Sequence, residues 1–348
     1  MKMTFRWYGG DDPISLKKIA QIPQMSGIVS AVYDVKPGGV WDEHSIEKIK
    51  NEANEHGLSF EVVESVPVHE DIKLGRNNAH DLIQNYCENI RRLSKFGVKC
   101  ICYNFMPVFD WLRSELCHIQ PDGANALKYD HEAMLKMDPL KGDLSLPGWD
   151  ASYSKDELAG LINEYREIGE NGLWSNLEAF LKAVIPVAKS VGVNMAIHPD
   201  DPPWGMFGLP RIITNKENLC RMMNIVDEPN NGLTFCTGSL GANPDNDLVD
   251  MAKTFSKRIH FVHLRNIKIT GERCFEEVAH PTKCGSLDMY AIAKALIESG
   301  FDGYVRPDHG RMIWGESGKF GYGLYDRALG AAYLTGLFEA IERNNENE

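Results

Sequence analysis

The sequence predicts an α/β protein whose fold is a closed (β/α)8 TIM barrel with insertions after strands 4 and 7. Short β-branched or apolar runs alternate with longer segments of helical period, which indicates repeated βα units and a parallel sheet. Eight such units can be counted, and eight is the number that closes a barrel of this kind. The chain has 348 residues, roughly 100 more than such a barrel usually needs, so the excess has to be accommodated in insertions.

The expected strands are short apolar segments, and most of them end in a polar residue. They are 3–8, 27–33, 58–64, 98–104, 193–198, 232–236, 258–263 and 303–308. Runs of this length and composition are typical of strands that are covered by helices on their outer face.

The expected helices follow these strands in order. They are 15–21, 42–55, 77–96, 173–190, 215–227, 247–255, 288–300 and 324–342. N-capping side chains stand at five helix starts, namely Ser15, Asp42, Asn215, Asp247 and Asp288. Glycine stands at four ends, just before the next strand, namely Gly57, Gly97, Gly192 and Gly300. These signals support the helix boundaries independently of the hydrophobic period.

The excess length falls mainly at about 105–172, after the fourth strand, with a smaller insertion at 266–287 after the seventh. Loops on this side of a barrel surround its active site. The first insertion contains the aromatic residues Phe109, Trp111, Trp149 and Tyr153. We expect it to form either a lid or an oligomer contact, and the sequence favours neither of the two. The whole chain, 1–348, is expected to be a single catalytic domain.

Charge and composition restrict the partners of the protein. Lys and Arg total 37 against 49 Asp and Glu, a formal charge of −12, which disfavours a nucleic-acid partner. The N-terminus lacks the apolar region of a signal peptide, and no run is long enough to span a membrane. We therefore expect a soluble cytoplasmic protein with mostly reduced thiols among its eight cysteines. We also expect a homo-oligomer that acts on a small molecule.

The last four expected strands end in His198, Cys236, His263 and Asp308. All four are metal-ligand types, and the carboxyl ends of neighbouring barrel strands meet at one rim. Each residue alone would be interpreted as structural, but their conjunction predicts one divalent metal site. If His263 points into the barrel, His260 points out, because residues three apart on a strand face opposite sides.

Further polar residues at the same rim are candidates for binding substrate. Tyr8, Glu64 and Asn104 end strands in the first half of the barrel, where we expect contacts to substrate hydroxyls. Asp200 lies in the turn after His198 and is expected either to support the metal ligands or to bind substrate.

Two arginines lie close to the expected metal ligands. Arg306 has the inward parity of Asp308, and Arg265 stands just beyond His263. A buried guanidinium needs a carboxylate partner. That partner is expected to be a substrate carboxylate, Glu64 or an acid of the turn at 200–201.

Two groups at the rim could transfer protons. His309 directly follows Asp308, so its imidazole is expected to lie beside a bound cation. Tyr322 and Tyr325 lie in a segment with two glycines that leads into the last helix, where either hydroxyl could turn inward. By contrast, Cys100 and Cys102 share one strand face and are expected to be core residues. The segment 238–241 fits neither a Rossmann nor a P-loop pattern.

At these residues the chain resembles the mannonate dehydratase family of hexuronate and glucuronate catabolism, in the xylose-isomerase-like barrel superfamily. The resemblance covers nearly the whole chain. It rests on the motifs Trp7-Tyr8-Gly9, Val63 to His69, Tyr103 to Trp111, His198 to Pro203, and Arg306-Pro307-Asp308-His309-Gly310. Any one of these motifs is weak, but together they are highly specific.

The resemblance implies a lyase that eliminates water from D-mannonate to give 2-keto-3-deoxy-D-gluconate with a divalent ion. That ion is usually manganese, with Fe2+ or another divalent metal as the alternative. The implied ligands are His198, Cys236, His263 and Asp308. The implied acid and base are His309 and Tyr322, with Tyr325 still open and the order of acid and base unassigned.

Two other functions would use the same residues. A metal-dependent sugar isomerase on this barrel would interconvert an aldose and a ketose. A sugar-acid-binding protein would use the metal only to hold its ligand. Product analysis separates the three, because only dehydration yields a 2-keto-3-deoxy acid.

Overall fold

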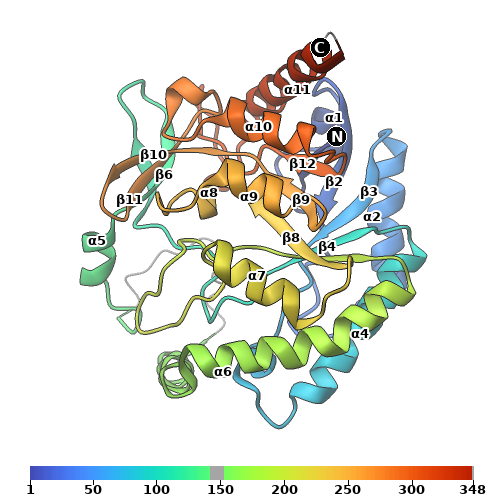
Figure 1. Ribbon diagram of the computed structural model, residues 1–348, viewed down its shortest axis with the longest axis vertical. Helices are drawn as coiled ribbons and strands as arrows, with labels where there is room; N and C mark the ends of the chain where they lie inside the picture. The colour runs from blue at the N-terminus through green and yellow to red at the C-terminus, as the bar shows by residue number, and fades with distance from the viewer. Residues whose placement is uncertain (142–152, 347–348) are drawn as a thin grey trace.

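The computed structural model describes residues 1–141 and 153–346, and it confirms the predicted barrel (Figure 1). The strands pair in parallel in the closed order β1-β12-β9-β8-β7-β4-β3-β2. Their bounds are β1 (Lys2–Arg6), β2 (Met25–Ser30), β3 (Ser59–Glu64), β4 (Cys100–Tyr103), β7 (Asn194–Ile197), β8 (Asn231–Cys236), β9 (Ile259–His263) and β12 (Tyr304–Arg306). All eight predicted strands are therefore present, each within a few residues of its expected ends.

Helices surround the barrel where the 3.6-residue period predicts them. They are α1 (Leu16–Ile19), α2 (Glu43–Glu55), α4 (Ala79–Lys95), α6 (Lys155–Ser190), α7 (Lys216–Ile225), α9 (Leu248–Thr254), α10 (Met289–Glu298) and α11 (Tyr325–Glu346). Four of the predicted caps accept a backbone N–H, namely Asp42, Asn215, Asp247 and Asp288. Ser15 makes no side-chain cap at the four-residue α1, so that prediction is wrong. The four predicted helix-ending glycines all have positive φ.

Helix α6 begins 18 residues before its expected start at Leu173. Ser154 and Glu157 form a capping box that satisfies the first backbone donors. The backbone leaves helical geometry at Gly169, with φ 56° and ψ −165°. The sequence analysis predicted only the part of the helix that follows this interruption.

The barrel interior is a small apolar cluster made by inward-pointing side chains of alternate strand positions. Its members are Val29, Val62, Cys100, Cys102, Ala196 and Phe261. The prediction that Cys100 and Cys102 are core residues is thus confirmed. A much larger core fills the space between the strands and the helices, which leaves the carboxyl ends of the strands as the polar face.

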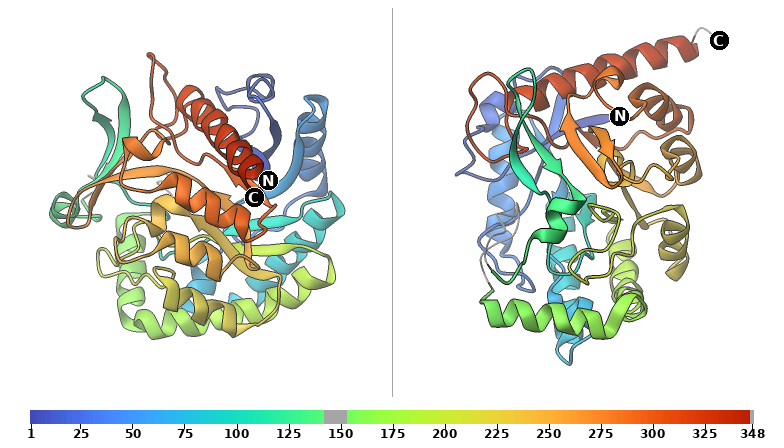
Figure 2. Two further views of the ribbon diagram at one scale, coloured as in Figure 1. Left: turned by 45° about the horizontal axis from the view of Figure 1, so that its top comes forward. Right: turned by 90° about the vertical axis from the view of Figure 1, so that its left-hand side faces the viewer.

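The two insertions combine into a second sheet, which the sequence analysis did not predict. Its strands are β5 (Glu115–Ile119), β6 (Asn125–Tyr129), β10 (Asn266–Gly271) and β11 (Cys274–Val278), in the order β10-β11-β6-β5. Strands β6 and β11 pair antiparallel and join the two hairpins, which lie side by side in both views of Figure 2. Phe109, Trp111 and Tyr153 lie among the described residues, whereas Trp149 lies outside them.

Short helices complete the connections on this side: α3 (Glu70–Leu74), α5 (His131–Lys136), α8 (Thr237–Leu240) and the 3-10 turn η1 (Thr282–Cys284). Within the part of the chain that the structure describes, no helix combines the length and apolar character needed to cross a membrane.

Candidate active site

A cavity of about 160 Å³ opens at the carboxyl ends of the barrel strands. Most of the predicted site residues line it, namely Tyr8, Glu64, Asn104, His198, Arg265, Arg306, Asp308, His309 and Tyr322. Cys236 and His263 do not line the cavity but contact residues that do. The barrel therefore gathers side chains from strands far apart in the sequence around one small polar space.

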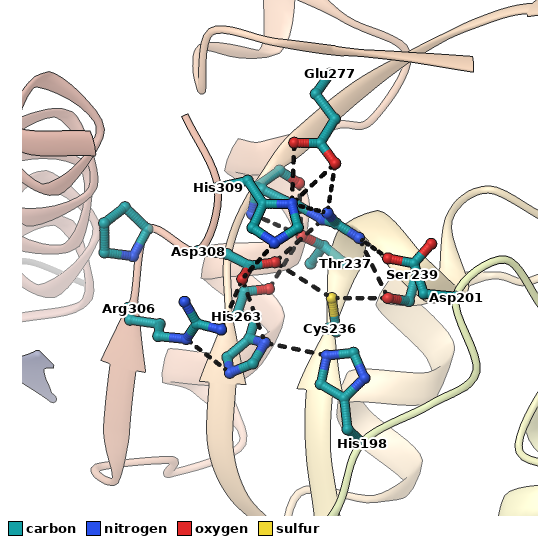
Figure 3. A network of polar contacts seen from close by, with 12 residues as sticks. His198, Asp201, Cys236, Thr237, Ser239, His263, Glu277, Arg306, Asp308 and His309 are labelled. Carbon is teal, nitrogen blue, oxygen red and sulfur yellow. Dashed lines mark hydrogen bonds and ion pairs between the residues drawn. The ribbon is translucent and has the colours of Figure 1, made fainter. Parts of the chain in front are cut away.

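The four predicted metal ligands converge at one side of this cavity (Figure 3). His198 Nε2 lies 3.2 Å from His263 Nδ1, and Asp308 lies 3.6 Å from both Cys236 Sγ and His263 Nδ1. Ligand atoms of His198, Cys236 and His263 all lie within 4.8 Å of one another. The alternation of side chains along the strand is also as predicted, because His260 points away from this cluster and contacts the Pro229 carbonyl.

The chemistry of the cluster fits a divalent cation. The Nδ1 atom of His198 lies 2.7 Å from the carbonyl of Pro199, and a carbonyl only accepts, so the ring proton is on Nδ1 and the Nε2 lone pair faces the cluster. A second imidazole, a thiol and a carboxylate complete a donor set of two nitrogens, one sulfur and one oxygen. Asp308 has φ 63°, a left-handed conformation that is unusual for a residue other than glycine.

Arg306 neutralises acids beside this cluster. Its Nη2 lies 3.1 Å from Glu64 Oε1 and 2.8 Å from Asp308 Oδ1, and its Nε donates to His263 Nε2 at 2.9 Å. Burial opposes ionisation of Glu64, but the charge of Arg306, followed by those of His263 and Arg6, lowers its pKa to about 2. A second group of ligand types, Glu64, Cys102 and His263, is also close together. Arg306 already supplies a positive charge there.

Several buried polar atoms around the cavity have no hydrogen-bond partner among the described residues. They include Arg6 Nη1, Glu64 Oε2, Tyr103 Oη and Arg306 Nη1, and all four residues line the cavity. Arg6 Nη1 and Glu64 Oε2 lie 3.7 Å apart, beyond hydrogen-bond distance. Leaving such groups unpaired is costly. A polyhydroxylated anion would satisfy both the donors and the acceptor.

His309 and Tyr322 meet at the rim, because His309 Nε2 lies 3.0 Å from Tyr322 Oη. Both side chains are buried, at 5% and 8% exposure. Burial raises the pKa of the Tyr322 phenol, although the charge of Arg306 opposes the shift. Tyr325 is 43% exposed and packs against Trp314, so the structure brings Tyr322 and not Tyr325 to the cavity.

The turn after His198 requires a correction. Asp200 does not line the cavity; it accepts from the backbone of Ile213 at 2.8 Å and pairs with Arg211. Its neighbour Asp201 does line the cavity. Consecutive residues of the turn point in different directions, so Asp201 rather than the predicted Asp200 lines the cavity.

Asp201 belongs to a buried network of charges. Arg113 binds it with two hydrogen bonds of 2.9 and 3.0 Å, and Arg265 binds it at 2.6 Å. Arg265 also lies 3.1 Å from Asp308. Both predicted arginines therefore pair with carboxylates of the protein itself.

The sequence analysis did not identify four residues at or beside the site, namely Arg6, Arg113, Glu277 and Lys319. Arg6 has the same strand parity as Tyr8, which is the signal that identified Arg306, so it could have been found. Arg113 and Glu277 lie in the two insertions, where no strand-end rule applies. Lys319 lies on the loop before Tyr322 with its Nζ 3.9 Å from the centre of the Tyr8 ring, and no local pattern marks it.

Comparisons with known proteins give matches that extend along the full length of this chain. The family model described as D-mannonate dehydratase (UxuA) matches residues 1–348. A mannonate dehydratase of Streptococcus agalactiae serotype Ia is 53% identical over 348 residues, which cover 99% of this chain and 100% of the relative. The crystal structure of mannonate dehydratase from Streptococcus suis serotype 2 has a TM-score of 0.92 at 46% identity, covering 99% of this chain and 95% of that one.

A more distant comparison concerns the fold alone. A xylose isomerase-like TIM barrel protein from Mycobacterium smegmatis, solved in complex with magnesium, has a TM-score of 0.53 at 13% identity. It covers 94% of this chain. This likeness supports the barrel fold.

Proposed function

This chain belongs to the D-mannonate dehydratase family, and we propose that the cavity described above is where it acts as a hydro-lyase, with His309 and Tyr322 transferring protons. The family reaction eliminates water from D-mannonate and yields 2-keto-3-deoxy-D-gluconate. The observation that carries the assignment of the site is the juxtaposition, in one cavity, of the His309–Tyr322 pair with the cluster of metal-ligand types.

The proposed ligands of a divalent ion are His198, Cys236, His263 and Asp308, and the proposed ion is manganese, with Fe2+ as the alternative. Thiolate and imidazole would bind zinc tightly, so a preference for manganese has to come from geometry or supply. When bound, the ion supplies positive charge that stabilises charge developing on the substrate carboxylate and an adjacent hydroxyl.

The proposed substrate contacts are Tyr8, Glu64, Asn104, Arg265 and Arg306, to which we add Arg6 and Asp201. The Nη1 atoms of Arg6 and Arg306, which have no hydrogen-bond partner, are donors for an anionic, hydroxylated ligand. The Oε2 atom of Glu64, which also lacks a hydrogen bond and lies 3.7 Å from Arg6 Nη1, is an acceptor. An Arg-to-carboxylate hydrogen bond is among the stronger polar contacts in proteins. Burial of these groups keeps water from competing with the substrate.

The chemical step needs one base and one acid. A base removes the proton on the carbon next to the carboxylate, the 3-hydroxyl leaves with a proton from an acid, and the resulting enol becomes the ketone. His309 and Tyr322 are close enough to exchange a proton with each other and both line the cavity. They are the proposed base and acid.

We further propose that residues 1–348 form one catalytic domain, that the protein is cytoplasmic, and that it works as a homo-oligomer without nucleic-acid or membrane partners. The low pI of about 5.4 supports the absence of a nucleic-acid partner. Gel filtration with light scattering reports the oligomeric state.

One experiment tests the function and its alternative. The purified protein is incubated with manganese and a panel of aldonic acids, and the products are identified. We expect a 2-keto-3-deoxy acid from D-mannonate. An aldose–ketose pair would favour the isomerase, and unchanged substrate with measurable binding would favour a sugar-acid-binding protein.

A further inference from the structure

Glu277 lies in the insertion sheet, on β11, yet its carboxylate contacts His309 at the barrel rim (Figure 3). The Nδ1 atom of His309 is 2.9 Å from Oε1 and 3.0 Å from Oε2 of Glu277. Glu277 does not line the cavity, so any effect it has on the reaction passes through the cavity residues it contacts, His309 and Arg265.

The Glu277 carboxylate is 3% exposed, and a buried carboxylate needs donors at both oxygens. Its Oε1 receives Arg113 Nη2 and Arg265 Nη1, each at 2.7 Å. Among the residues that the structure describes, Oε2 has one hydrogen-bond partner, Nδ1 of His309. Because a carboxylate oxygen only accepts, this contact satisfies Oε2 only when Nδ1 carries the ring proton.

One contact favours the opposite arrangement. Arg265 Nη1 lies 2.6 Å from His309 Nδ1, and it could donate to Nδ1 if that atom were unprotonated. However, Arg265 has other acceptors, including Glu277 Oε1 and Asp201 Oδ2, whereas Glu277 Oε2 has no other donor. Because the buried Glu277 Oε2 would otherwise have no hydrogen-bond donor, the proton of the His309 ring is assigned to Nδ1.

We propose that Glu277 is a positioning residue that holds the proton of neutral His309 on Nδ1 and so keeps the Nε2 lone pair directed at Tyr322 and the cavity. This inference rests on the proposed function and refines it. His309 becomes the base and Tyr322, whose hydroxyl donates to Nε2, becomes the acid. In the Ser-His-Asp triad of serine hydrolases, a carboxylate on the far nitrogen of the imidazole base acts in this way.

Arg113 holds Glu277 in place. Its side chain is 0% exposed and bridges Asp201 of the barrel turn and Glu277 of β11. Its guanidinium also lies over the ring of Phe275, 4.9 Å from the centroid. Arg113 precedes β5 and Glu277 belongs to β11, so both insertions together orient a residue of the barrel rim.

The test compares Glu277→Gln with Glu276→Gln. Glu276 is the next residue along the same strand, but it contacts His118 and Lys268 outside the site, so it is a matched control. We expect Glu277→Gln to lower kcat about 10- to 100-fold, with KM for D-mannonate and metal content unchanged. Glu276→Gln should keep the wild-type kcat.

Nitrogen NMR of 15N-histidine-labelled protein reads the tautomer directly. The spectrum is recorded on metal-free and on zinc-loaded protein, since zinc is diamagnetic, and the spectrum of His309→Asn identifies the signals. We expect a protonated Nδ1 and an unprotonated Nε2 in the wild-type protein and in Glu276→Gln. In Glu277→Gln the proton should move to Nε2, because Arg265 then donates to Nδ1.

Glu277→Asp separates positioning from packing. It keeps the charge but shortens the side chain, so it should retain more activity than Glu277→Gln, whereas a purely structural role predicts the reverse. An unprotonated Nδ1 in the wild-type protein, or a wild-type kcat in Glu277→Gln, would overturn the proposal. Because NMR needs no turnover, a failure of the wild-type protein to dehydrate D-mannonate would be distinguishable from a failure of this inference.

Discussion

The Nε2 atom of His309 lies 3.0 Å from the phenol oxygen of Tyr322, and the two rings meet edge to face. His309 lies three residues after the end of strand β12, and Tyr322 lies in the loop before helix α11. A loop of 12 residues therefore brings both groups to one edge of the cavity. Four predictions follow from this arrangement and from the groups around it.

The proton-transfer pair is tested by His309→Asn and Tyr322→Phe. Each should lower kcat by about 10² to 10⁴-fold, the usual contribution of a general acid or base, while metal content and substrate binding persist. His309→Asn should also abolish exchange of the substrate C2 hydrogen with solvent deuterium. Tyr325→Phe is the matched control and should be fully active, because Tyr325 is exposed away from the cavity. Full activity in both site variants would exclude the pair.

The metal site is tested by chelation. Removing the ion should abolish activity, and one divalent ion per chain should restore it, because the cluster offers a single set of four ligands. Cys236→Ser should retain metal poorly yet unfold at nearly the wild-type temperature, whereas Cys117→Ser, at an exposed thiol, should keep its metal. Measured metal content decides the question: full occupancy in both Cys236→Ser and His263→Ala would remove the proposed site.

Substrate charge is tested with D-mannonate and neutral D-mannose. The cavity contains guanidinium Nη1 atoms of Arg6 and Arg306 that have no hydrogen-bond partner, on a protein whose net charge is −12, so the anion should react far better. Arg6→Met should raise KM for D-mannonate, because an Arg–carboxylate contact is lost. Steady-state kinetics with both sugars provide the measurement, and equal turnover of the two would contradict an acid-specific site.

Lys319 also lines the cavity, so we expect its charge to contribute to binding the anionic substrate and to make KM depend on pH. Burial, followed by the charge of Arg6, lowers the Lys319 pKa to about 8, so the ammonium is present below this pH and lost above it. KM for D-mannonate should therefore rise about tenfold as the pH increases through 8. The profile is measured at constant ionic strength.

Two variants isolate that effect. Lys319→Arg should keep KM low to higher pH, because a guanidinium stays charged. Lys319→Gln should have the high KM at every pH. The same pH profile in Lys319→Gln as in the wild-type protein would mean that another group is responsible.

The sequence by itself determined the barrel and most of the rim. Period-2 and period-3.6 patterns are local, so they identified all eight barrel strands and the main helices, apart from the early start of α6 at Lys155. Parallel strands in a closed barrel end at one rim, and this rule is enough to predict that His198, Cys236, His263 and Asp308 lie together. The alternation of side chains along a strand likewise predicts that His263 and His260 face opposite sides of the sheet.

Only the tertiary structure decided the contacts that lie outside this rule. The choices between Asp200 and Asp201 and between Tyr322 and Tyr325 depend on the path of a turn and of a loop, which no periodicity describes. Strands β6 and β11 pair although nearly 150 residues separate them in the chain, and this pairing brings Glu277 and Arg113 together over His309. Such contacts are stabilised by burial and by charge pairing between segments that are distant in the chain. These interactions form only when folding brings the segments together, so no local sequence pattern indicates them.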